Sequence, residues 1–328
     1  MVRAPFVRIA EQITMPECSC RNCGKQFEVP VRHRLLVGDS RNPGDIERLF
    51  AGAKANVAIT SPPYASQRKY DESSGFKPIP PDQYVAWFEA VATAIKSVLA
   101  PDGSYFLNIK AHTDAGERSL YVMDLVLAHK RKWGWRFVDE FCWRKTDNGV
   151  PGSWPNRFKN AFEPVFHFTR ATKIQFTPGN VSHASESVME TGGNSAHADG
   201  RRFDIHGSPS VYTGESKRRI RGMAFPSNVI EVKAETAQGA HAAPFPRALV
   251  EFFLKAFSDE GDVIFDGFMG SGTTMAAAHV LKRSGYGIEI SPGYADVIIL
   301  RLVALGAGSV TLASTGQTFD EVAKERKR

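Results

Sequence analysis

The chain has 328 residues, of which 42% are hydrophobic, and it carries a formal net charge of +6. This length fits one large α/β domain with an inserted segment or two smaller domains, and the basic charge favours an anionic partner such as nucleic acid. No apolar run approaches the roughly 18 residues that span a bilayer. The first twelve residues lack the apolar core and cleavage site of a signal peptide. We therefore expect a cytoplasmic protein with no membrane partner.

Residues 1–30 are predicted to form an N-terminal appendage. Three of the four cysteines, Cys18, Cys20 and Cys23, lie here in the sequence CSCRNCGKQF, which resembles one knuckle of a zinc ribbon. The second knuckle is missing, and His33 would have to complete the ligand set. These cysteines are thus weak structural-zinc candidates, and we expect a remnant knuckle or reduced thiols. No catalytic metal is expected.

Strands and helices alternate through the next part of the chain. Short buried strands are predicted at residues 33–40 and 55–60, with a helix at 43–51 between them. After a polar loop from Ala65 to about Pro81, apolar residues at 3–4 residue spacing predict a helix that Pro101-Asp102-Gly103 stops. Further elements are predicted as a strand at 104–111, a helix at 120–133, and strands at 135–145 and 161–170.

Residues 171–240 differ in composition, because Gly, Ser, His and Asn are frequent and apolar periodicity fades. A stretch of this length without elements in a compact domain is usually functional or disordered. Regular patterns return after residue 240. They predict a helix at 245–257, a strand at 262–268, a helix after GSGTT, a strand at 284–290 and a helix at 293–305. This alternation predicts an α/β fold with a doubly wound, mostly parallel sheet.

Asp266 to Thr274 reads DGFMGSGTT, a Gly-rich turn between a predicted strand and a predicted helix. Open α/β sheets bind ligands at this edge. The turn has no P-loop lysine, which disfavours triphosphate binding. The next strand delivers Glu289, whose carboxylate can accept hydrogen bonds from two vicinal ribose hydroxyls. The pattern therefore indicates a nucleoside cofactor.

Thr60 to Tyr64 reads TSPPY and closes an apolar strand. The two prolines fix φ and donate no backbone hydrogen bond, so they hold carbonyl groups in a rigid array. An exocyclic amine needs acceptors, which the Ser61 hydroxyl and the Pro62 carbonyl can supply, while Tyr64 can stack on a base. Direct in-line transfer to such an amine depends largely on positioning. For this motif alone, an ordinary proline turn is the alternative.

The two motifs together resemble those of the DNA amino-methyltransferases, and their order resembles the β group of this family. The resemblance covers about residues 34–305 and implies a Rossmann-like fold that binds S-adenosylmethionine. It implies that Asp39 accepts the adenine amino group and that Asp266 and the glycine turn face the methionine part. The implied catalytic residues are Ser61, Pro62, Pro63 and Tyr64. The implied cofactor residues are Asp39, Phe245, Pro246, Asp266, Phe268, Gly270, Ser271, Gly272, Thr273, Thr274 and Glu289.

Within this family, Ser at the first motif position usually accompanies cytosine-N4 methylation, so we favour that branch of the type II modification enzymes. Adenine-N6 stays open, because Ser and Asp both present an oxygen acceptor. Cys142 lacks the Pro-Cys setting of carbon-5 cytosine methyltransferases. A methyltransferase acting on RNA or a protein amide is a further alternative, which the motif order and the basic insertion disfavour. A DNA-binding module with a degenerate fold is disfavoured by the intact Ser61, Tyr64, Asp266 and Glu289.

A base in duplex DNA must be flipped out before it reaches the cofactor, and this requires a basic cleft. For each basic residue, the alternative is a solvated surface charge. The candidate DNA-binding residues are Arg68, Lys69, Arg201, Arg202, Lys217, Arg218, Arg219 and Arg221.

The change in composition along the chain, together with the places of the two motifs, predicts a division of the chain. It predicts a catalytic half at residues 31–170, a target-recognition region at 171–240, a cofactor-binding half at 241–310 and a C-terminal tail at 311–328. Double-stranded DNA is the expected partner. Whether the enzyme forms a homodimer, and whether it works beside a cognate restriction endonuclease, stays open.

Overall fold

The computed structural model describes residues 6–9, 17–19, 26–28, 32–65, 76–114, 116–146, 158, 160–184, 188–191, 217–220, 223–233 and 245–326. The chain divides into two compact units, one formed by residues 1–177 and 228–328 and the other by residues 178–227. In the smaller unit, η3 (Pro178–Val181) precedes two small antiparallel sheets. These pair β11 (His183–Ala184) with β14 (Met223–Ala224), and β12 (Val188–Thr191) with β13 (Lys217–Ile220).

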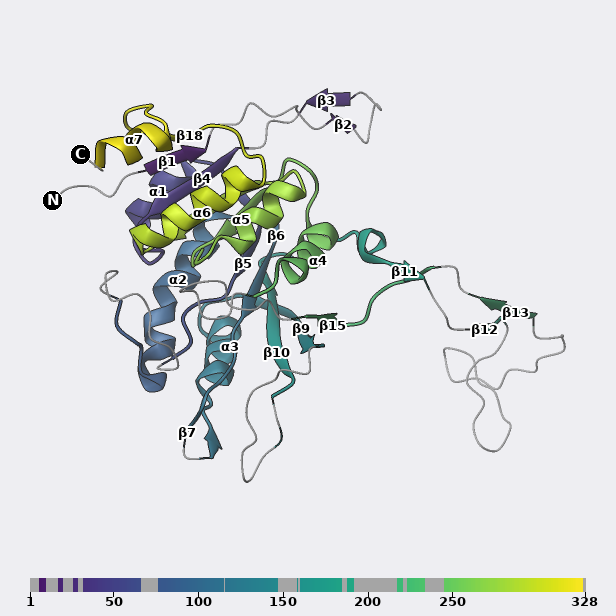
Figure 1. Ribbon diagram of the computed structural model, residues 1–328. Helices are drawn as coiled ribbons and strands as arrows, with labels where there is room; N and C mark the ends of the chain where they lie inside the picture. Colours follow the sequence, from purple (N-terminus) through teal and green to yellow (C-terminus); the bar gives the residue numbers. More distant parts are fainter. Residues whose placement is uncertain are drawn as a thin grey trace. The chain divides into compact units, whose positions relative to one another are not determined.

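The larger unit is built on a ten-stranded mixed sheet (Figure 1). Its five central strands run parallel, and the next strand, β10, is antiparallel to both of its neighbours. At the other edge, β1 is antiparallel to both β4 and β18. The order across the sheet is β15 (Val229–Val232), β9 (Arg136–Lys145), β10 (Phe162–Thr169), β6 (Leu99–Asn108), β5 (Ala55–Thr60), β16 (Val263–Asp266), β17 (Ser284–Glu289), β4 (His33–Val37), β1 (Phe6–Ile9) and β18 (Val310–Leu312).

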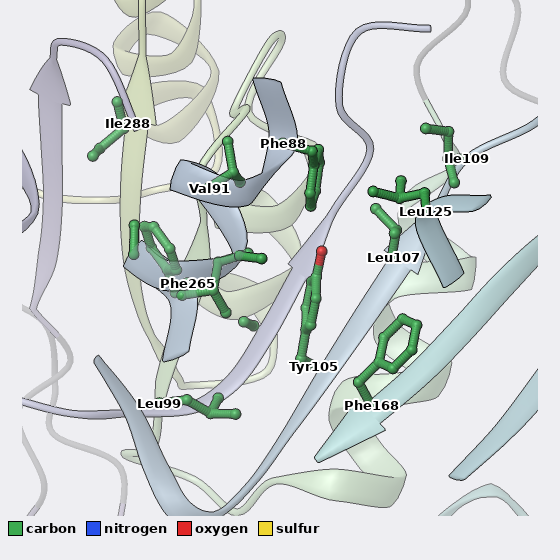
Figure 2. Close-up of a cluster of buried hydrophobic side chains, with 14 of the residues drawn as sticks. Phe88, Val91, Leu99, Tyr105, Leu107, Ile109, Leu125, Phe168, Phe265 and Ile288 are labelled. Carbon is green, nitrogen blue, oxygen red and sulfur yellow. The ribbon is translucent and has the colours of Figure 1, made fainter. Parts of the chain in front are cut away.

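Helices cover both faces of this sheet, and successive residues of a strand point to these two faces in turn. On β6, Tyr105 and Leu107 join the cluster that includes Phe88 and Leu125 (Figure 2). Between them, Phe106 packs against Phe253 on the opposite face, at 4.4 Å between ring centroids. The helices of the larger unit are α1 (Pro43–Phe50), α2 (Tyr84–Val98), α3 (Tyr121–Arg131), α4 (Arg247–Phe257), α5 (Thr273–Val280), α6 (Pro292–Ala304) and α7 (Phe319–Arg326). The predicted α/β fold with a doubly wound, mostly parallel sheet is confirmed.

The chain reverses its direction of travel across the sheet between β5 and β16. From β5 the chain continues through α2 to β6, whereas from β16 it continues through α5 to β17 on the other side. In open α/β sheets, ligands bind outside the carboxyl ends of the strands at such a switch point. The residues at these ends are Val37 of β4, Thr60 of β5, Asp266 of β16 and Glu289 of β17.

One predicted boundary was wrong, namely that between the helix after the polar loop and the strand that follows it. The helix α2 ends at Val98, and β6 already begins at Leu99, so Pro101 to Gly103 belong to the strand. A register shift between Ala55 and Val57 of β5 accommodates the added residues. A Cβ at Gly103 would lie 2.8 Å from the Asn56 carbonyl oxygen, so glycine permits this close approach.

The terminal segments contribute more structure than the sequence indicated. Residues 6–9 form β1 of the main sheet, and residues 310–312 and 319–326 form β18 and α7. Cys18 lies in β2 (Glu17–Ser19), which pairs with β3 (Gln26–Glu28), whereas Cys20 and Cys23 lie outside the described residues. His33 is buried and accepts a hydrogen bond from the Gly285 amide.

Two kinds of feature are absent from the described residues. None of the helices there is long and apolar enough to cross a membrane. Within the same described part of the chain, no three His, Cys, Asp or Glu side chains lie close enough together to hold a metal ion.

Candidate active site

The Gly-rich turn joins β16 to α5 and folds back onto the end of β17. Gly270 and Gly272 adopt φ values of 53° and 80°, a region that side chains with a Cβ disfavour. The side chain of Ile298 on α6 packs under Gly272, where a Cβ would lie 3.0 Å from it. Arg301 of the same helix donates to the Ser271 carbonyl and to the Thr273 hydroxyl, at 3.2 Å each. Helix α6 therefore packs against the turn and stabilises its conformation.

Glu289 is fixed at the end of β17 by backbone donors. Its Oε2 accepts from the Gly270 amide at 2.7 Å, and its Oε1 accepts from the Ser291 amide at 2.9 Å. The residue is 7% exposed, and burial raises its pKa to about 7, although these backbone hydrogen bonds oppose the shift. The Ile290 amide is a third, weaker backbone donor to this carboxylate, which keeps acceptor capacity for a ligand hydroxyl.

Asp266 is buried and forms a link between two segments. Its Oδ1 accepts from the Thr60 hydroxyl at 2.7 Å and from the Phe268 amide at 2.9 Å. Its Oδ2 accepts from the Thr274 hydroxyl at 2.6 Å. Burial raises the pKa of Asp266, whereas its three hydrogen bonds favour the charged form. The carboxylate thus joins the strand end before Ser61 to the turn and helix that follow β16.

Asp39 lies just beyond β4 and is paired with Arg41. The guanidinium Nη2 lies 2.6 Å from Asp39 Oδ2, and the same group lies over the Trp87 ring at 5.7 Å from its centroid. Trp87 in turn lies 5.9 Å from Phe268, measured between ring centroids. Burial opposes charge on Asp39, but the contacts with Arg41 outweigh it and lower the pKa of this carboxyl. Two aromatic rings and an ionised carboxylate therefore lie between β4, α2 and the Gly-rich turn.

The TSPPY segment follows β5 at the same edge of the sheet. Tyr84 of α2 donates to the Pro63 carbonyl at 2.6 Å and so restrains this backbone. Ser61 and Pro63 are partly exposed, and Pro62 and Tyr64 are buried. The Tyr64 hydroxyl lies 3.0 Å from Glu163 Oε2 of β10.

The structure brings together most of the predicted site residues. Those of the Gly-rich turn, Asp39, Glu289 and the TSPPY segment lie at the carboxyl ends of adjacent parallel strands. Phe245 and Pro246 lie directly before α4, which Pro246 caps. Of the predicted DNA-binding residues, Lys217, Arg218 and Arg219 lie in β13 of the smaller unit. The others lie outside the described residues: Arg68, Lys69, Arg201, Arg202 and Arg221.

Several residues of the site were not predicted from the sequence. Arg41, Trp87 and Tyr84 carry no motif, and their roles depend on contacts between separate elements. Glu163 did leave a signal, since a carboxylate inside the apolar run AFEPVFHF must find a partner when the strand is buried.

Comparison with known proteins agrees with this geometry. A family model described as DNA methylase, covering N6 and N4 methyltransferases, matches residues 55–300. The type II methyltransferase M.PvuII of Proteus hauseri is 24% identical over 289 residues, which cover 82% of this chain and 83% of that protein. The orphan methyltransferase M.BamHII of Bacillus amyloliquefaciens is 25% identical over 254 residues, which cover 75% and 88% of the two proteins.

A solved structure shows the same fold. The PvuII DNA methyltransferase, described as cytosine-N4-specific, superposes with a TM-score of 0.57 at 22% identity, covering 81% of this chain and 85% of that chain. The family match alone spans more than half of the sequence and contains both motifs. The chain therefore belongs to the N6/N4 family of DNA methylases.

Proposed function

We propose that this DNA amino-methyltransferase acts on the N4 amino group of a cytosine flipped out of duplex DNA. One observation carries the proposal. The Thr60–Asp266 hydrogen bond, between residues 206 positions apart, joins the TSPPY segment to the Gly-rich turn. An amine held at Ser61 and a methyl donor held at the turn would thereby share one edge of the sheet. The solved PvuII enzyme, which is described as cytosine-N4-specific, supports the choice of base.

S-adenosylmethionine is the methyl donor of this family, and the donor set of the site fits it. Glu289 offers two anchored oxygens that suit vicinal ribose hydroxyls. Asp39 offers an ionised acceptor for the adenine amino group, and Phe268 offers a ring beside it. The turn at Gly270 and Gly272 permits close approach of a backbone to the methionine part. When bound, the cofactor supplies an activated methyl group.

The residues of this chain then act by binding and orienting the amine. The Ser61 hydroxyl and the Pro62 carbonyl would accept hydrogen bonds from its two N–H groups, which draws the nitrogen lone pair out of conjugation with the ring. Tyr64 would stack on the base. Since the transfer is direct, alignment of the two reactants supplies much of the rate.

Recognition of DNA is proposed for the region 171–240, with the basic residues at 201–202 and 217–221 contacting phosphates or guanine edges. Arg68 and Lys69 would close over the flipped base. The relatives include both type II and orphan methyltransferases. A partner endonuclease and a homodimer are alternatives to a protein that acts alone.

The test is to weigh the nucleosides of DNA methylated by the purified protein. Genomic DNA that lacks the host modification is incubated with labelled S-adenosylmethionine, digested and analysed by mass spectrometry. We expect N4-methylcytosine. A product consisting only of N6-methyladenine would replace the base but keep the enzyme class, whereas label in RNA or protein and none in DNA would overturn the proposal.

A further inference from the structure

We infer that Glu163 is a positioning residue that orients Tyr64 through the tyrosine hydroxyl. The inference rests on the proposed function, because it takes Tyr64 as the residue that meets the base. It extends that function to β10, a strand that carries none of the recognised motifs.

The contact joins two strand ends that are distant in the sequence. Tyr64 Oη lies 3.0 Å from Glu163 Oε2 and 3.4 Å from Asn108 Oδ1. The hydroxyl has one hydrogen to donate, and the charged acceptor at the shorter distance is favoured. Asn108 is itself held by donating to the Pro164 carbonyl at 3.1 Å. Tyr64 and Glu163 are 6% and 5% exposed, so little water competes for this hydrogen bond.

Two lysines keep Glu163 available as an acceptor. Its other oxygen, Oε1, lies 3.1 Å from Lys110 Nζ and 2.7 Å from Lys145 Nζ. Burial opposes the charge on Glu163, but both lysines outweigh it and lower the pKa of the carboxyl. Oε1 is thereby committed to the lysines, which leaves Oε2 for Tyr64. The carboxylate is therefore ionised at neutral pH and can accept from the Tyr64 hydroxyl.

This arrangement argues for orientation rather than proton transfer. A general base works best when its pKa is near the operating pH, and the lysines move Glu163 away from that range. A ring whose far end is hydrogen-bonded to a fixed carboxylate has little freedom to rotate away from a stacked base. Tyr64 is also restrained at its near end, since Tyr84 holds the Pro63 carbonyl. The hydroxyl of Tyr64 and the backbone directly before this residue are therefore both held by neighbours.

The experiment is a double-mutant cycle between Tyr64→Phe and Glu163→Ala, read as turnover at saturating DNA and S-adenosylmethionine. Each single variant should lower turnover by about tenfold through misplacement of the ring. The double variant should be no slower than the slower single one. Cofactor affinity, measured by calorimetry, should not change. Glu163→Gln keeps an oxygen acceptor for the hydroxyl and should restore turnover to within about threefold of the wild type.

Two further variants protect the result against misfolding. Glu163→Leu combined with Lys145→Met removes the acceptor and one cation together, so the excess buried charge that Glu163→Ala leaves is reduced, and it should reproduce the loss of turnover. Glu231→Gln changes an exposed ion pair with Arg144 and should have no effect.

The outcomes separate the two proposals. If Glu163→Ala lowered turnover as much in the Tyr64→Phe background as in the wild type, or acted only on cofactor affinity, the positioning role would be overturned. A wild-type protein that transfers no methyl group to DNA would instead overturn the proposed function.

Discussion

The carboxylate of Glu289 is buried, and the ribose of S-adenosylmethionine is its proposed ligand. It is 7% exposed, and its pKa is raised to about 7 by burial. Near neutral pH, a free protein would therefore hold a mixture of its charged and neutral forms. Ribose hydroxyls donate best to the charged form, so binding of the cofactor should draw the proton off.

This coupling predicts a pH dependence of cofactor binding. Because only the ionised Glu289 offers both acceptors, affinity for S-adenosylmethionine should fall by at most roughly tenfold between pH 7.5 and pH 6. Calorimetry across this range measures it. Glu289→Gln, which does not titrate, should bind more weakly at pH 7.5 and show a flat profile. An equally steep profile in that variant would assign the titration to another group.

At the scale of elements, β5, β16 and α5 are joined through a single carboxylate. Asp266 accepts from Thr60 and from Thr274, and both hydroxyls are buried with it. The sequence motif suggested that Asp266 faces the methionine part of the cofactor. With 1% exposure and three donors, the carboxylate has the contacts of an internal support for the turn.

Removing one of these hydroxyls should loosen the link without removing the charge. Thr60→Val and Thr274→Val should each cost about 1–3 kcal/mol of unfolding free energy, since a buried acceptor loses its donor. Thr→Ser at the same positions keeps the hydroxyl and serves as the control. Urea denaturation measures the stability, and calorimetry should show weaker cofactor binding in Thr274→Val. Wild-type stability in both valine variants would show that the link contributes nothing.

At the scale of the whole molecule, buried histidines make the fold sensitive to acid. His129 is buried against Phe168, with ring centroids 4.5 Å apart, and burial lowers its pKa to about 4 despite a hydrogen bond to Leu125. His33 and His167 are likewise buried, and their pKa values are lowered to about 3, chiefly by burial. The unfolded chain binds protons at these sites near pH 6.5, so acidification below that value favours unfolding.

Replacing His129 by an aromatic residue that does not titrate should remove its contribution to the loss of stability in acid. In the wild type, His129 accounts for about 2 kcal/mol of the stability lost between pH 7.5 and pH 5. His129→Phe keeps a ring against Phe168 and should reduce the loss by that amount, measured by urea denaturation at both values. The same loss in the variant and the wild type would contradict the assignment.

The sequence predicted the succession of the central strands and helices along the chain, because their apolar periodicity is strong. It also predicted the Gly-rich turn between β16 and α5, since glycines with positive φ leave a recognisable pattern. The start of β6 was missed because Pro101-Asp102-Gly103 normally stops a helix, whereas a register shift against β5 places it in the sheet. Likewise, β1 and β18 depend on pairing across the whole length of the chain, and Arg41 depends on the position of Trp87. Local patterns carry no such information.

In the sheet, β16 and β17 lie between β5 and β4, two strands that come much earlier in the sequence. β16 pairs with β5, and β17 pairs with β4, so the later segment fills a slot in the sheet formed by the earlier one. A chain cut within the unit 178–227 would yield one piece with TSPPY and one with DGFMGSGTT, each with unpaired strand edges. Neither piece should bind S-adenosylmethionine alone, whereas co-expression should restore DNA methylation. Methylation of DNA in such cells would then report that the two fragments had associated.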